Sequence, residues 1–563
     1  MPPALQPNLQ GSLSAFPIRF WVAVAIAGAL AGLAAGALML LLRAVQHLAW
    51  AYAGGLFADA VVRAPVARRL AVPAAAGLLA GLGGLALRRA VGGQAIELAA
   101  AIWFGPGRLP VAYTLARGAL SIVIVGLGAS LGREGAPKQA GAAIAAALGG
   151  WLRLTPARCR LLAACGAGAG MAAVYNVPLG GALFAVEVLL GSLSLSLVVP
   201  AVATSAIATV FSHLLLPNQA TYSLPALQAS PADLAAAAVL GPAAGLASAL
   251  YVRLIAWADA RRPGGWARGL APLAVLTALG ALAIPLPQLL GNGKDLVDEV
   301  LFGRPDLLLL VVLLVAKPMV TAGCLASGAP GGLFTPTLAF GALLGGACGR
   351  AWGHFWSAAP QSHFAVLGAA AVLAATTQAP ISALVLVLEL IRGVDGLTLP
   401  LLVAAASAVA AASFLDGRSI YSARVHKGRR ATEDLPAAPS VPAGMLVAAR
   451  ERVVSAATPL DEILRLHSAG TLSAPLYVLD EEGRLVGEIR PSALLDAAGR
   501  CPLPETTTAA DLANGVTAID ATAPPETLTE TLTETMARRG RTELPLVAPS
   551  TGRLVGIVRT RRD

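Results

Sequence analysis

Charged residues are scarce in this chain, and the acidic ones are unevenly distributed. Asp, Glu, Lys and Arg make up 13% of the 563 residues, whereas hydrophobic residues make up 56%. Residues 1–430 contain 13 Asp and Glu residues, and the much shorter segment 431–563 contains 18. This composition excludes an ordinary soluble enzyme and predicts a membrane-embedded body followed by a soluble domain.

Cysteine and histidine are too few and too scattered to form a disulfide framework or a metal centre. The five cysteines show no metal-ligand spacing, and the six histidines form no HxxxH-type pair. The net charge of +10 comes largely from arginines in loops, which favours a cytoplasmic position for those loops. Because these arginines are not gathered on a polar module, nucleic-acid binding is disfavoured. The apolar stretch after Arg19 is too long for a signal-peptide core, which predicts a retained membrane helix.

More than ten apolar runs follow one another between residues 20 and 415. They cover residues 20–42, 70–87, 109–131, 137–152, 161–174, 178–191, 196–216, 232–257, 268–290, 306–326, 333–352, 363–376, 380–392 and 397–415. Several are shorter than the roughly 20 residues that a helix needs to span a bilayer. Short segments interrupted by Gly and Pro are typical of transporters with re-entrant helices.

Two glycine-rich motifs lead into helix-forming runs inside this apolar sequence. Residues 132–139 read GREGAPKQ, and residues 331–336 read GGLFTP. Irregular backbone at membrane depth is tolerated only where protein buries it or a wet cavity borders it. Two helix N-termini that meet there direct partial positive charge at one point. The sequence therefore predicts an anion site, with Glu134 as a titratable carboxylate beside it.

An internal repeat supports a two-part membrane body. Residues 176–187 (NVPLGGALFAVE) recur as residues 378–389 (QAPISALVLVLE), and each copy follows its own glycine-rich motif. Glu187 and Glu389 occupy the same place in the two copies, where we expect them to brace helix ends. We interpret the two copies as structural repeats that meet at a site near the middle of the membrane.

A polar tail follows a proline-containing linker at residues 431–444. Residues 475–490 and 545–559 are similar in sequence, and each predicts two strands joined by a glycine turn. Helical patterns precede them at residues 459–469 and 526–539. The tail resembles a tandem pair of cystathionine-β-synthase-type (CBS) modules, which often bind adenine nucleotides. Ala493 and Arg559 replace residues of the nucleotide motif. Packing between subunits is therefore an alternative role of the tail to nucleotide binding.

The motifs, their order and the tail together resemble the CLC family of chloride channels and proton/chloride antiporters. The GREG motif places Glu134 at the position of the family's gating glutamate. Residues 332–336 match the family's GxFxP motif, and Tyr421 matches its pore tyrosine. The resemblance covers nearly the whole chain.

Three departures from the family pattern bear on transport. The serine of the first pore motif corresponds to Gly93, so the pore would lose a hydroxyl donor. The inner proton-transfer glutamate of the antiporters corresponds to Val188, which cannot relay protons. Lys138 lies four residues after Glu134, so on a helix the two side chains would share a face. Lys138 would then pair with Glu134, or instead add positive charge to the anion path.

The resemblance implies an all-α polytopic membrane domain with inverted repeats and re-entrant helices at residues 1–430. A linker at 431–444 and a small α+β cytosolic CBS pair at 445–563 complete the expected organisation. The implied gate is Glu134, the implied anion contacts are Gly93, Gly135, Leu333, Phe334 and Tyr421, and the implied pore modulators are Arg133, Lys138 and Val188.

The resemblance also implies chloride transport by a homodimer in the inner membrane, with the tail in the cytoplasm, no enzymatic activity and no required cofactor. Val188 favours channel-like or weakly proton-coupled transport over stoichiometric proton/chloride antiport, which is the main alternative. Fluoride is an alternative anion. A cation transporter with CBS modules is a third alternative, but the membrane body has few acids to coordinate cations.

Overall fold

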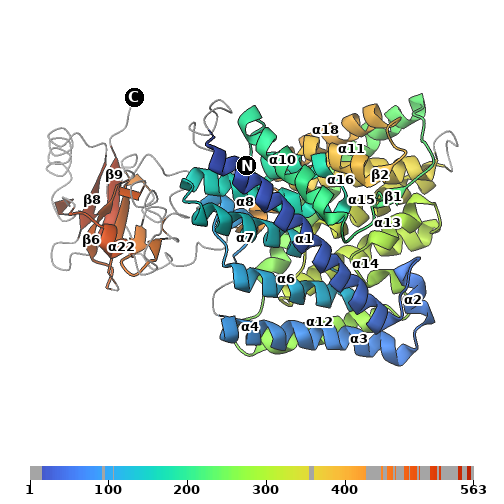
Figure 1. Cartoon of the computed structure of the whole chain (residues 1–563), viewed down its shortest axis with the longest axis horizontal. Helices are drawn as coiled ribbons and strands as arrows, with labels where there is room; N and C mark the ends of the chain where they lie inside the picture. Colours follow the sequence, from blue (N-terminus) through green and yellow to red (C-terminus); the bar gives the residue numbers. More distant parts are fainter. Residues whose placement is uncertain are drawn as a thin grey trace. The chain divides into compact units, whose positions relative to one another are not determined.

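The chain forms two compact units. The computed structural model describes residues 16–91, 96–104, 107–353 and 360–425, and short stretches of the tail between residues 446 and 559. The first unit comprises residues 1–102 and 107–425, and the second comprises residues 103–106 and 426–563 (Figure 1). The units are described separately below.

The first unit is almost entirely helical. Its helices are α1 (Ile18–Trp50), α2 (Phe57–Arg63), α3 (Val66–Leu78), η3 (Leu79–Gly83), α4 (Gly84–Val91), α5 (Leu98–Phe104), α6 (Val111–Gly126), α7 (Gly135–Trp151), α8 (Pro156–Tyr175), α9 (Pro178–Leu183), η4 (Phe184–Leu190), α10 (Leu195–Ser212), α11 (Pro231–Ala260), α12 (Ala267–Leu282), η5 (Pro287–Leu289), α13 (Lys294–Leu301), α14 (Leu307–Ala326), α15 (Phe334–Trp352), α16 (Gln361–Thr377), α17 (Pro380–Leu390), α18 (Thr398–Leu415) and α19 (Ser422–Val425). Two short parallel strands, β1 (Tyr222–Ser223) and β2 (Ile391–Arg392), join distant loops.

Six helical stretches in the described residues are long and apolar enough to cross a membrane. They are α1, the continuous stretch Val66–Val91, α10, α11, α14 and α18. Helices also form in the other apolar runs, and four of these are apolar but shorter: α6, α9 with η4, α12 and α17. The prediction of a mostly helical, multi-pass membrane fold is therefore confirmed.

Small residues let the central helices pack backbone against backbone. A Cβ added to Gly141 of α7 would lie 2.1 Å from the carbonyl oxygen of Gly166 in α8. A Cβ added to Gly345 of α15 would lie 2.0 Å from the carbonyl oxygen of Phe364 in α16. Close approach of this kind is how helices associate where lipid offers no hydrophobic driving force. The α7–α8 and α15–α16 pairs are thus equivalent halves of the core.

The repeat is longer than the motif that first indicated it. Helices α6 to α10 and α14 to α18 follow one another in the same order, with α7 and α15 each beginning at a glycine-rich motif. Asn176 and Gln378 end α8 and α16 in the left-handed conformation, with φ of 57° and 56°. A proline, Pro178 or Pro380, then begins the next helix in each copy.

Reciprocal hydrogen bonds show how the two copies are related. Glu187 accepts hydrogen bonds from the backbone N–H groups of Ile381 (3.2 Å) and Ser382 (2.5 Å) at the start of α17. Glu389 accepts them from Leu179 (3.1 Å) and Gly180 (2.6 Å) at the start of α9. An interaction that each copy makes to the other in the same way indicates a local two-fold axis between them. The expected bracing of helix ends by these two glutamates is confirmed.

The second unit contains two small sheets with the same local topology. In one sheet β4 (Val453–Ser455) pairs parallel with β5 (Leu476–Leu479), which pairs antiparallel with β6 (Leu485–Ile489). In the other, β7 (Ile519–Asp520) pairs parallel with β8 (Glu543–Val547), which pairs antiparallel with β9 (Leu554–Arg559). A short strand β3 (Leu446–Val447) adds to β9, and helix α22 spans Ala509–Leu512.

The two paired strands of each predicted hairpin are therefore confirmed, whereas the turn of the second hairpin, at Gly552, lies outside the described residues. The positive φ of 80° at Gly483 explains the need for glycine in the first hairpin turn. The predicted helix at 526–539, and nearly all of that at 459–469, lie outside the described residues.

Candidate functional site

The two glycine-rich motifs meet in the first unit. Gly132 and Gly332 form an antiparallel bridge, in which each N–H donates to the other residue's carbonyl at 2.7 Å. This bridge brings the start of α7 and the start of α15 to one point. A Cβ added to Gly132 would lie 2.3 Å from both carboxylate oxygens of Glu134, so glycine is required for the observed position of that side chain.

Glu134 is fully buried, and although it is the N-cap residue of α7, its carboxylate lies at the N-terminus of α15. Its Oε1 accepts a hydrogen bond from the backbone N–H of Phe334 at 2.7 Å. This N–H belongs to the first turn of α15, where intrahelical partners are lacking and the helix dipole favours negative charge. The carboxylate thus occupies a place that would suit a free anion.

Two hydroxyl groups complete the surroundings of the carboxylate. Glu134 Oε2 lies 3.1 Å from Thr335 Oγ1 and 3.2 Å from the Tyr175 hydroxyl, and the two hydroxyls lie 2.5 Å apart. Each hydroxyl has one proton to donate, so the two can satisfy at most two of these three contacts at once. The sequence analysis missed both residues. Tyr175 at the end of an apolar helix belongs to no motif, and Thr335 occupies the second of the two variable positions of GxFxP.

A cavity of about 60 Å³ lies on one side of Glu134; we call it the Lys138 cavity. It is lined by Glu97, Leu98, Ala99, Gly135, Lys138, Gln139, Leu189, Gly331, Gly332, Leu333, Phe334, Thr337, Leu373, Thr377, Ile420, Tyr421 and Arg424. Since about 10–15 Å³ on this measure holds one water, the cavity has room for a small anion with water. Four of the five predicted anion contacts, Gly135, Leu333, Phe334 and Tyr421, therefore lie together.

Lys138 does not pair with Glu134, so the first of the two alternatives that the sequence left open is wrong. Its ammonium nitrogen lies 4.9 Å from the ring centroid of Phe184 and 5.7 Å from that of Tyr421. Among the described ion pairs none joins Lys138 to Glu134. The reason is that Glu134 is the N-cap of α7, so its side chain turns away toward α15 instead of following the helix face. The alternative, a cation lining the anion path, agrees with this position.

A second, larger cavity of about 240 Å³ lies on the other side; we call it the Arg133 cavity. Arg43, Arg133, Tyr175, Lys294 and Asp295 are among its lining residues. The guanidinium carbon of Arg133 lies 5.1 Å from the ring centroid of Tyr175, which is a cation–π contact. The neighbours of Glu134 in the chain thus face two different cavities, and neither cavity is lined by Glu134 itself.

The remaining predicted site residues lie elsewhere. Gly93 lies outside the described residues. Val188 is buried in the π-helix η4, and its neighbour Leu189, rather than Val188, lines the Lys138 cavity. In the part of the chain that the structure describes, no group of three or more His, Cys, Asp or Glu side chains could hold a metal ion.

Comparison with known families agrees with the anion site that the geometry indicates. Residues 76–413 match the family model described as voltage gated chloride channel. The chain belongs to this family. A ClcB-like chloride channel protein of Ralstonia nicotianae is 35% identical over 435 residues, which are 74% of this chain and 100% of the relative. The H(+)/Cl(-) exchange transporter ClcA of Vibrio parahaemolyticus is 34% identical over 331 residues, or 57% of this chain and 69% of the relative.

Solved structures of this family share the fold. A slow cyanobacterial Cl−/H+ antiporter superposes with a TM-score of 0.64 at 24% identity, covering 73% of this chain and 97% of that one. A eukaryotic CLC transporter superposes with a TM-score of 0.61 at 19% identity, covering 96% and 97%. At these identities the likeness establishes the fold alone.

Proposed function

We propose that this chain transports chloride through a path that Glu134 closes. The observation that carries the proposal is the hydrogen bond from the Phe334 N–H to the Glu134 carboxylate. A helix N-terminus buried away from water is a site for an anion, and here the chain's own carboxylate fills it. Protonation of Glu134, or competition by an incoming chloride, would release the side chain and join the two cavities.

The Lys138 cavity is the proposed resting place of the anion next to this gate. A chloride ion that leaves water must exchange its hydration shell for N–H groups, hydroxyls and fixed charge. The backbone at Gly135 and Phe334, the hydroxyl of Tyr421 and the ammonium of Lys138 offer such groups from different walls. Lys138 would compensate for the hydroxyl that is missing at Gly93.

Proton coupling is the point on which the two main alternatives differ. Val188 cannot carry a proton, and we therefore favour channel-like or weakly coupled transport without enzymatic activity. The relatives include proteins named as channels and proteins named as proton/chloride exchangers. A stoichiometric antiporter is the second candidate, since water in the Lys138 cavity could carry the proton instead.

One pair of measurements tests the proposal. Full-length protein and Glu134→Gln are reconstituted in liposomes, and chloride flux is followed over a series of pH values. The wild-type flux should rise as pH falls, whereas Glu134→Gln, which mimics the protonated gate, should lose that dependence. Equal pH profiles for the two proteins would reject the gate. A shift of the reversal potential with an imposed pH gradient would favour the antiporter.

The tail and the assembly are further parts of the proposal. The repeated strand topology of the second unit supports a tandem CBS pair, and the resemblance implies a homodimer in the inner membrane with this pair in the cytoplasm. An adenine nucleotide at the pair stays an open alternative to subunit packing. Arg559 is the last residue of β9, and Ala493 lies in a helical turn. Neither residue type offers the hydroxyl or carboxylate that the nucleotide motif has at these positions.

A further inference from the structure

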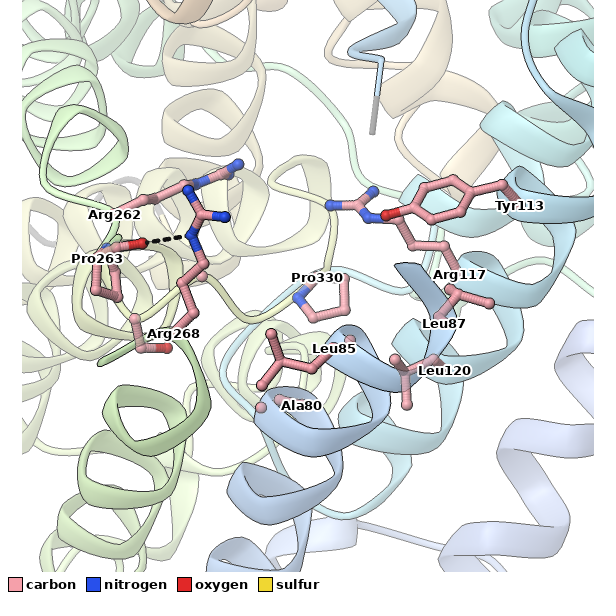
Figure 2. A pocket seen from close by; sticks show the side chains of 14 residues that line it. Ala80, Leu85, Leu87, Tyr113, Arg117, Leu120, Arg262, Pro263, Arg268 and Pro330 are labelled. Atoms are coloured by element: carbon pink, nitrogen blue, oxygen red, sulfur yellow. Dashed lines mark hydrogen bonds between the residues drawn. The ribbon is translucent and has the colours of Figure 1, made fainter. Parts of the chain in front are cut away.

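A third cavity, of about 230 Å³, lies in the first unit, away from Glu134; we call it the three-arginine pocket. It is lined by Ala80, Gly81, Gly84, Leu85, Leu87, Tyr113, Arg117, Leu120, Arg262, Pro263, Arg268, Ser327, Gly328 and Pro330. Figure 2 shows Arg262 and Arg268 on one wall, and Arg117 beside Tyr113 on the opposite wall. None of the lining residues is acidic, whereas three are arginines.

The nearby acids do not balance these arginines. Asp259 pairs with Arg262 at 2.7 Å, but it is shared with Arg424 at 3.4 Å. Arg424 also pairs with Glu97 at 2.6 Å.

The three arginines of the pocket and Arg424 therefore carry four positive charges, and Asp259 and Glu97 neutralise two of them. Two positive charges remain at this end of the unit. In addition, the Nε of Arg262 is buried without a hydrogen-bond partner. A buried N–H donor without an acceptor is costly unless a ligand supplies one.

The position of the pocket indicates the level of the membrane surface. It lies at the end of the membrane-length stretch Val66–Val91, next to the loop between α11 and α12. Trp257 and Trp266 flank that loop and are 52% and 81% exposed. Exposed tryptophans and arginines at helix ends are typical of the bilayer–water interface. Lipid phosphates lie at this level, and the apolar side of the pocket would suit the adjoining glycerol and acyl groups.

We propose that the three-arginine pocket binds a phosphate group with two negative charges, supplied by an anionic lipid. Guanidinium groups recognise phosphate oxygens by paired N–H donors, and three of them converge on this pocket. A free phosphate shares this chemistry, and the experiment below distinguishes it from a lipid.

The pocket is also connected to the proposed pore. Arg117 contacts Gln139, which lines the Lys138 cavity, at 3.5 Å. Pro330 lines the pocket immediately before the GGLFTP motif, and its carbonyl accepts a hydrogen bond from Ser121 at 3.0 Å. Binding of phosphate would therefore shift residues that contact or adjoin both glycine-rich motifs. This coupling rests on the proposed function, whereas the binding site does not.

Lipid retention tests the binding site. Full-length protein in phosphatidylcholine nanodiscs, with or without phosphatidic acid, is extracted and its bound lipid is counted by native mass spectrometry. Wild type should retain phosphatidic acid, and R117Q/R268Q should lose at least tenfold in retention. R89Q removes a charge from the same helix end outside the pocket and should retain the lipid. Because Arg268 is exposed, R268Q alone reports on the site without altering a buried position, and R268K should restore binding.

The outcomes separate the alternatives. Equal retention of phosphatidic acid by wild type and R117Q/R268Q would overturn the site. Displacement of the lipid by millimolar inorganic phosphate would support a phosphate-binding pocket but reject the claim that only a lipid supplies the phosphate. Chloride flux in liposomes with phosphatidic acid should differ from flux without it in wild type and R89Q, but not in R117Q/R268Q. Retention with unchanged flux would overturn the coupling alone, and absence of any flux would count against the proposed function.

Discussion

The hydroxyl groups of Thr335 and Tyr175 should set the pH at which the gate opens. Both lie within hydrogen-bonding distance of one oxygen of the buried Glu134 carboxylate, at 3.1 and 3.2 Å. Donors to a carboxylate stabilise its charged form, which is the closed state of the proposed gate. Removal of a donor therefore favours the protonated, open state, so the midpoint of the flux–pH curve should move to higher pH.

The structure allows the size of this shift to be worked out. A hydrogen bond to a charged group contributes about 1.5–3 kcal/mol, and about 1.4 kcal/mol corresponds to one pH unit. In Thr335→Val the Tyr175 hydroxyl can turn to Glu134, so we expect an upward shift of about one unit. Tyr175→Phe leaves Thr335 as donor and should shift the midpoint less. The double variant leaves only the Phe334 N–H, and should shift it by about two units.

Chloride efflux from proteoliposomes over a pH series measures these midpoints. Tyr222→Phe is the control, because it removes the hydroxyl of another buried tyrosine, and none of the described hydrogen bonds joins that hydroxyl to Glu134. A double variant equal to the sum of the singles would contradict the shared-donor arrangement, since the two hydroxyls bond to each other. Midpoints that fall, or that do not move, would refute the assignment of these hydroxyls.

Three further predictions follow from the same contacts. Gly132→Ala should displace the Glu134 carboxylate and give flux with little pH dependence, whereas Gly150→Ala, where an added Cβ meets nothing within 4 Å, should behave as wild type in the same efflux assay. Lys138→Met keeps the packing on the aromatic rings but removes the charge, so chloride affinity by calorimetry should fall about tenfold, or about 1.4 kcal/mol; unchanged affinity would remove Lys138 from the anion path. Glu389→Gln weakens two hydrogen bonds at the start of α9 and should lower the free energy of unfolding by about 1 kcal/mol, visible as a lower melting temperature; an unchanged value would show that the cap is dispensable.

The sequence predicted those parts of the site that depend on backbone breaks. GREG and GGLFTP mark two helix starts, and the prediction that they meet needed only the rule that broken backbone must be buried. The alternative that paired Lys138 with Glu134 failed because helical spacing applies only inside a helix, and Glu134 lies just before α7. Thr335 and Tyr175 act on Glu134 through contacts across elements, and no local pattern encodes those.

The repeat shows the same limit. Residues 176–187 and 378–389 were recognisable because a proline and a glutamate occupy matching places in each copy. Helices α6 to α8 and α14 to α16 correspond as well, but their Ala-, Gly- and Leu-rich sequences serve close packing and leave many residues interchangeable. Three-dimensional order is therefore retained where sequence similarity has faded.

The crossed glutamates have a consequence for biogenesis. While the ribosome has completed only the portion up to α10, Glu187 already exists, but the amides at positions 381 and 382 do not. The start of α9 likewise lacks Glu389 until α17 emerges. The first half thus enters the lipid with the start of α9 unsatisfied, and the docking of the two halves must await translation of the second. Two separately expressed halves should accordingly find each other through these ends.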